Sequence, residues 1–175
     1  DIYSDADKQA DSRKNNTGLF FFRGEPGRPF AIVCPGGGFS YVGAIHEGFP
    51  LAIALSRMGY NAFSIQYRTG GAQVACEDLA QAINFIMRHA EELQVSTEDY
   101  SLWGGSAGAR MAAYLGSYST QGFIDATHER PAAVIMGYTG HSEYTQNDPP
   151  TYVIIGEDDA IANPATMRRR VENLQ

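Results

Sequence analysis

Five residues near the middle of the sequence, 104–108, spell the pattern G-x-S-x-G around Ser106. A run rich in β-forming residues, 100–103, precedes the pattern, and a helical run, 107–118, follows it. A serine in a tight turn from strand to helix is raised above the end of the sheet as a nucleophile, and the residues two before and two after it must be small. The two outer glycines meet this demand, so we predict that Ser106 is a nucleophile.

A second candidate group is the glycine run 36–38, which follows the apolar run 30–34 and precedes Phe39. Attack on an ester places negative charge on the former carbonyl oxygen, which preorganised N–H groups stabilise by about 3 kcal/mol per donor. We expect Gly37 and Gly38 to donate such N–H groups, joined by Ala107 after the nucleophile. An ordinary glycine turn is the alternative. No phosphate-loop pattern is present, so nucleotide binding lacks support.

The candidate acid lies after the apolar run 152–155, where Gly156 leads into three acidic residues. A carboxylate at the end of a late strand can hold an imidazole in one tautomer and stabilise the imidazolium that forms during catalysis. Asp159 is our choice for this role, Asp158 is a close rival and Glu157 a distant one. The alternative is a set of solvated acids in a surface loop.

The four histidines do not fit the usual order of serine, acid and histidine, because none follows Asp159. His89 and His128 have the character of surface residues. His46, after the glycine run, and His141, after a predicted strand, are candidates for lining the pocket. Phe39 and Tyr138 are further candidates, as walls of an acyl pocket or a platform for a sugar, with core packing as the alternative.

The composition excludes several classes of protein. The chain has 175 residues, 43% hydrophobic residues and a net charge of -7, so a nucleic-acid partner is not expected. The two cysteines, Cys34 and Cys76, form no metal-binding pattern and are expected to be buried free thiols. We expect no metal, no other cofactor and no membrane partner, since no apolar run is long enough to span a bilayer. The compartment stays open, with the cytoplasm slightly favoured and export not excluded.

Short apolar runs alternate with helical patterns, which is typical of a mostly parallel sheet covered by helices. We expect one domain over residues 1–175, with 1–16 as a loose N-terminal arm and with too few residues between Ser106 and Asp159 for a lid domain. Homo-oligomerisation is left open. The expected strands are 17–23, 30–34, 61–67, 100–103, 132–136 and 152–155, and the expected helices are 47–58, 72–94, 107–118 and one that starts at Pro164.

Four segments together resemble a known family: CPGGGFSYVGAIHEGFPLA, NAFSIQYR, GGSAG and IGEDDAIANP. They are similar to bacterial α/β-hydrolases of the acetyl (xylan) esterase and feruloyl esterase-like branch. This resemblance implies the α/β-hydrolase fold, and it favours Asp159 over Asp158 because the family's acid follows a glycine by three positions. It also implies one more strand and helix, with the catalytic histidine between them, so we expect that histidine to lie outside this chain.

The expected function is therefore that of a serine carboxylic-ester hydrolase that forms an acyl-enzyme on Ser106. A site without a lid would be open, which favours small-molecule or carbohydrate esters with short acyl groups, such as acetylated sugars. Two alternatives remain. One is a binding protein that keeps the α/β-hydrolase fold without a complete catalytic set, and the other is a thioesterase.

Overall fold

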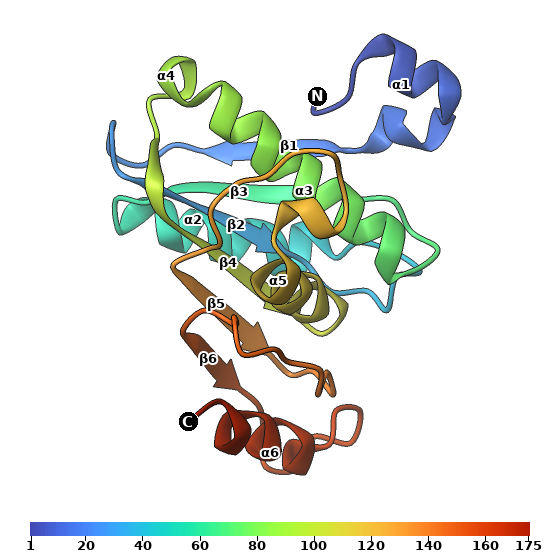
Figure 1. The fold of residues 1–175 in the computed structure, drawn as a ribbon, viewed down its shortest axis with the longest axis vertical. Coiled ribbons are helices and arrows are strands. Elements are labelled where there is room, and N and C mark those ends of the chain that lie inside the picture. Colours follow the sequence, from blue (N-terminus) through green and yellow to red (C-terminus); the bar gives the residue numbers. More distant parts are fainter.

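A six-stranded sheet, in the order β1-β3-β2-β4-β5-β6, runs through the computed structural model, which describes residues 1–175 (Figure 1). Strand β1 pairs with β3 in antiparallel fashion, and all other neighbouring pairs are parallel. The mostly parallel sheet predicted from the sequence is confirmed. The strands are β1 (Gly18–Phe22), β2 (Pro29–Cys34), β3 (Asn61–Gln66), β4 (Ser96–Gly105), β5 (Ala133–Gly137) and β6 (Thr151–Ile154).

Six α-helices connect or flank the strands, and none of them combines the length and apolar character needed to traverse a bilayer. They are α1 (Asp5–Ala10), α2 (Phe49–Arg57), α3 (Ala72–Arg88), α4 (Ala90–Leu93), α5 (Ala107–Tyr118) and α6 (Pro164–Leu174). Shorter helical turns are the 3₁₀ helices Ser12–Asn16 and Thr120–Gly122 and the π-helix Ala44–Gly48.

The helices cover both faces of the sheet, so its central strands are buried on two sides. In β2, Ala31 and Val33 pack against α2, while Phe30 and Ile32 belong to the larger core formed with α3 and α5. A strand with two covered faces has no polar face, which explains the unbroken apolar run in the sequence. Both cysteines are buried and unpaired, as predicted.

Helix boundaries agree with the sequence pattern where a strong signal marks them. Helix α5 has the predicted bounds, and the side chain of Asn163 caps α6 by accepting the N–H of Ala165 at 2.9 Å. The long helix predicted for 72–94 is instead divided into α3 and α4 at His89, whose Nδ1 lies 2.8 Å from the carbonyl oxygen of Phe85. Apolar residues continue at helical spacing from α3 through α4, so the periodicity of the sequence did not indicate this break.

The first residues form a docked segment in place of the loose arm that the sequence led us to expect. Ile2 is only 4% exposed and belongs to the main core. The hydroxyl of Tyr3 donates to the fully buried Asp78 at 2.5 Å, and Arg68, which binds Asp78, also forms an ion pair with Asp11 at 3.1 Å. A polar segment thus docks because a buried carboxylate needs partners.

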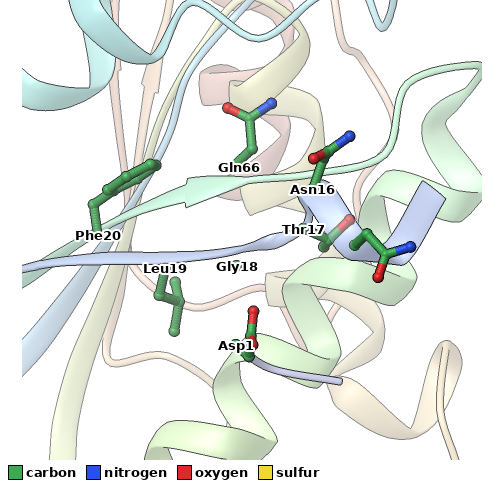
Figure 2. A pocket seen from close by; sticks show the side chains of 8 residues that line it. Asp1, Asn16, Thr17, Gly18, Leu19, Phe20 and Gln66 are labelled. Atoms are coloured by element: carbon green, nitrogen blue, oxygen red, sulfur yellow. The ribbon is translucent and has the colours of Figure 1, made fainter. Parts of the chain in front are cut away.

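A hollow of about 460 Å³ lies beside β1, where Figure 2 shows Asp1, Asn16, Thr17 and Gln66 around it. Strand β1 is three positions away from β4 in the sheet. The hollow therefore contains none of the residues that the sequence analysis proposed for chemistry.

Candidate active site

The segments predicted to carry chemistry leave the sheet at one edge, because the strands that precede them are parallel and in register. Cys34 at the end of β2 is paired with Gly104, Gly105 at the end of β4 with Gly137, and Gly137 with Ile154 at the end of β6. The glycine run, Ser106, Tyr138 and the acidic loop follow these strand ends in the sequence. Ligand sites of open parallel sheets lie at this edge.

Ser106 occupies a strained turn between β4 and α5, with φ 52° and ψ -117°. Such a conformation is uncommon for a residue with a side chain and persists only where the surroundings fix it. Its N–H donates to the carbonyl of Gly137 at 2.9 Å, and its carbonyl accepts from Ala109 at 3.1 Å. The Ser106 side chain is partly exposed, and its hydroxyl has no hydrogen-bond partner in the structure.

The outer glycines of the motif lie where no side chain fits. A Cβ on Gly104 would lie 2.2 Å from the carbonyl oxygen of Gly108, and a Cβ on Gly108 would lie 1.8 Å from that of Cys34. The glycine run also lies close to the serine, since a Cβ on Gly36 would lie 3.1 Å from the Cβ of Ser106. The structure therefore brings the glycine run and Ser106 into contact.

The three predicted oxyanion donors have no protein acceptor in this arrangement. Gly37 and Gly38 have φ values of 140° and 62°, and their N–H groups donate to no protein acceptor. Ala107 is the first residue of α5, where an N–H has no acceptor within the helix. The geometry leaves these amides available to an anion, and their role as an oxyanion hole stays a prediction.

Glu47 holds the glycine run, a contact that the sequence analysis missed. Its Oε2 accepts the N–H of Gly36 at 2.6 Å from the π-helix that follows the loop. The loop itself closes through the N–H of Gly43, which donates to the carbonyl of Gly36 at 2.9 Å. Glu47 follows Gly36 by eleven positions, and no sequence pattern indicates that the chain folds back between them.

Tyr138 lies over the strand end that leads into Ser106. A Cβ on Gly105 would lie 2.2 Å from the Tyr138 hydroxyl oxygen. Burial, with the negative charge of Glu47 as the second cause, raises the pKa of Tyr138 above its usual value. Phe39 directly follows the glycine run, and the guanidinium of Arg110 is 6.0 Å from its ring centre. Both aromatic residues are thus near the predicted nucleophile loop.

Asp159 is fixed in the loop after β6 by its own turn. Its Oδ1 accepts the N–H groups of Ala162 at 2.7 Å and Ile161 at 2.8 Å, and these bonds lower the pKa of the carboxyl group. Asp158 and Glu157 are exposed and make no hydrogen bond. Strand β6 is two positions from β4, so the two strands that lead to Ser106 and to the Asp159 loop are roughly 10 Å apart.

None of the four histidines contacts Ser106. His46 is exposed, His89 contacts Phe85, and His128 lies 2.9 Å from Asn84. His141 is 5% exposed and meets Tyr114 edge to face with the ring centres 4.6 Å apart. Tyr114 is two helical turns beyond the nucleophile, about 12 Å along α5.

The environment of His141 is unfavourable for its charged form. Burial, followed by the positive charges of Arg170 and Arg110, lowers the pKa of His141 to about 4. Its Nε2 is buried without a partner. His141 is therefore a neutral residue of the packed interior near neutral pH, and His46 is exposed; the pocket role of both residues stays a prediction.

Comparison with known proteins agrees with this architecture. A stretch of 92 residues is 28% identical to an acetylxylan esterase of Xylanibacter ruminicola, covering 51% of this chain and 19% of that protein, so the chain spans about a fifth of this relative. An acetyl ester-xyloside bifunctional hydrolase of Caldicellulosiruptor lactoaceticus superposes with a TM-score of 0.80 at 19% identity, covering 90% of this chain and 72% of that one. A lipase/esterase of Lactobacillus plantarum superposes with a TM-score of 0.76 at 20% identity, covering 91% of this chain and 83% of that one.

The match to a family model covers the glycine run, the nucleophile turn and the strand that ends before Tyr138. The model is that of the BD-FAE family, and it matches residues 23–138, more than half of the chain. An α/β hydrolase enzyme from a Medee basin deep-sea metagenome library has the same fold, with a TM-score of 0.77 at 23% identity over 90% of this chain and 71% of that one. The chain has the α/β-hydrolase fold and belongs to the BD-FAE family, in an esterase-like branch of these hydrolases.

Proposed function

We propose that this protein is a serine carboxylic-ester hydrolase for short-acyl esters, acetylated carbohydrates among them. The observation that carries this proposal is the strained turn at Ser106, whose hydroxyl is free and whose Cβ lies 3.1 Å from the Cβ position of Gly36, the first residue of a glycine run with unpaired amides at Gly37 and Gly38. Strain of this kind is retained where the geometry itself is needed. A nucleophile next to unpaired N–H donors is the arrangement that acyl transfer requires.

In the proposed reaction, the Ser106 hydroxyl attacks the ester carbon and transfers its proton to a histidine. The amides of Gly37, Gly38 and Ala107 stabilise the oxyanion, and the alcohol leaves with a proton from the imidazolium. Water then hydrolyses the acyl-enzyme. Asp159, held by its turn, orients the imidazole. Because no histidine of this chain contacts Ser106, we propose that the proton acceptor is a histidine other than these four.

The proposed substrate class rests on the open surroundings of the site and on two relatives. The connection between β5 and β6 comprises only residues 138–150, and it is pinned to α5 by Ser117, which donates to Asp148 at 2.6 Å. A short, pinned connection favours a shallow site for small acyl groups. The names of the acetylxylan esterase and the acetyl ester-xyloside hydrolase favour an acetylated carbohydrate.

A binding protein with this fold is a second candidate, because the unpaired amides of Gly37 and Gly38 offer hydrogen bonds to an acyl ligand whether or not Ser106 reacts. It would hold an ester or acyl ligand against the free amides without turnover. A thioesterase would use the same residues as an esterase, so only the choice of substrate separates these two activities.

The test is intact-mass spectrometry before and after a fluorophosphonate, with turnover of p-nitrophenyl acetate and acetyl-thiocholine on the same sample. We expect one covalent adduct at Ser106, ester turnover that exceeds thioester turnover, and loss of both adduct and turnover in Ser106→Ala. A folded protein that binds acetate esters without adduct or turnover would be a binding protein. Faster thioester cleavage would identify a thioesterase.

A further inference from the structure

Arg110 is an unpaired cation one helical turn beyond Ser106. Its side chain is exposed and forms no ion pair or hydrogen bond. The other arginines near this edge are used structurally: Arg68 binds Asp78 at 2.8 Å and Arg170 binds Asp148 at 2.7 Å. In a chain with a net charge of -7, Arg110 is therefore free positive charge beside the nucleophile.

A groove between α3 and α5 lies next to this arginine, because Tyr114 of its lining follows Arg110 by one helical turn. Arg110, Tyr114 and Tyr118 recur every four residues after Ser106, so they form one stripe on the surface of α5. The two tyrosine rings are stacked with centres 6.3 Å apart. The groove has a volume of about 300 Å³, at the lower end of the range for ligand sites. Its lining residues are Ala72, Gln73, Cys76, Tyr114, Tyr118, Gly122 and Phe123.

The guanidinium of Arg110 is close to the residue that follows the glycine run. It is 6.0 Å from the ring centre of Phe39, which directly follows the glycine run. Its charge acts on both sides of the groove: it opposes the rise in the pKa of Cys76 that burial causes, and it contributes to the lowered pKa of His141 behind Tyr114. The carboxylates beside the groove have other partners: Glu143 accepts from the Tyr118 hydroxyl, and Glu77 accepts from Gln73 at 3.1 Å. Neither forms an ion pair with Arg110, so an anion at the Arg110 end of the groove would meet an unpaired cation.

We propose that Arg110 and the α3–α5 groove form a subsite for a carboxylate on the substrate. The substrates favoured by this subsite are esters that carry an acidic group about one helical turn, roughly 5 Å, from the reacting carbonyl. The planar fork of arginine binds a carboxylate through two parallel hydrogen bonds, and the tyrosines supply an apolar platform for the adjoining ring. This inference rests on the proposed function for the position of the ester, and the carboxylate contact itself requires no turnover.

The test compares two ligands that cannot be hydrolysed as esters and differ in charge, 4-acetamidobenzoate and 4-acetamidobenzamide. Dissociation constants are measured by ligand-observed NMR titration at low and high salt. We expect the protein to bind the carboxylate about tenfold more tightly than the carboxamide, with the difference shrinking at high salt. Arg110→Gln is expected to remove this preference, and Arg110→Lys to retain part of it.

The matched control is Arg169→Gln, which removes an exposed arginine of α6 outside the groove and should leave the preference unchanged. Equal affinity for the two ligands, failure to bind the carboxylate, or a preference that survives in Arg110→Gln would overturn the inference. Ser106→Ala should keep the preference. If the protein prefers the carboxylate but Ser106 is not labelled by the fluorophosphonate, only the proposed esterase function is contradicted. If Ser106 is labelled but the carboxylate is not preferred, only the proposed subsite is contradicted.

Discussion

The two ends of the candidate site are built in opposite ways. At the nucleophile end, β2, β4 and the start of α5 approach so closely that Gly104 and Gly108 leave no space for a Cβ. At the acid end, the side chain of Asp159 is held only by the backbone N–H groups of Ile161 and Ala162, which belong to its own turn.

This difference follows from what each end must do. A nucleophile with φ 52° would relax unless several segments fixed it, so the fold supplies contacts that tolerate no side chain. An orienting carboxylate needs only a fixed position, which a short turn provides. Substitutions should therefore affect the fold at the nucleophile end and the chemistry at the acid end.

The largest effect is expected from Asp159→Asn. The amide oxygen can still accept the N–H groups of Ile161 and Ala162, so the turn should persist. The neutral side chain cannot stabilise an imidazolium and favours the wrong tautomer, so kcat for p-nitrophenyl acetate should fall by about 10⁴-fold. Thermal unfolding should be nearly unchanged. Asp158→Asn is the control, and an equal loss of kcat in that variant would assign the acid role to Asp158.

Gly108→Ala tests the nucleophile end. The new methyl group would lie 1.8 Å from the carbonyl oxygen of Cys34, so β2 and α5 must separate. We expect a loss of more than about 4 kcal/mol in the free energy of unfolding, measured with urea. Gly156→Ala at the acid end adds a methyl group that meets nothing within 4 Å and should change stability by less than about 0.5 kcal/mol. Similar losses in the two variants would refute the contrast.

The residues that the sequence placed correctly are those with local signals. Helix α5, the end of β2 at Cys34 and the small residues around Ser106 follow from patterns within a few positions of each other. What the sequence did not reveal depends on contacts between distant segments. Asp78 binds Tyr3, 75 positions away, which docks a segment that looks loose by composition. Glu47 binds Gly36 only because the loop folds back, and no periodicity encodes that return.

The stability of the fold should depend on pH through His141, whose pKa is lowered by burial and by the positive charge of Arg170. Its pKa is 6.5 in the unfolded chain and about 4 in the fold, so between these values the unfolded chain binds a proton that the fold excludes. Stability is therefore full above about pH 6.5 and falls toward pH 4, by up to about 3 kcal/mol.

The variant that tests this effect is His141→Phe, which keeps a ring against Tyr114 and removes the buried, unpartnered Nε2. Urea unfolding from pH 7 to pH 4 should show a smaller loss of stability in this variant than in the parent. His46→Gln, at an exposed position, should follow the parent curve. Parallel curves for His141→Phe and the parent would show that His141 is not the group responsible.

The smallest effect is expected from substitutions of Glu47, whose side chain accepts a hydrogen bond from the glycine run at the nucleophile end. Glu47→Leu removes the acceptor for the Gly36 N–H, while the bond from Gly43 to the Gly36 carbonyl remains. The neighbouring amides of Gly37 and Gly38 should then be less well aimed, and kcat should fall about tenfold with little change in KM, since the oxyanion exists only in the transition state. Glu47→Gln still offers an oxygen to Gly36 and should restore most of the rate. Equal defects in the two variants would mean that Glu47 acts through its charge, for example on Tyr138, and that the packing of the glycines alone positions the loop.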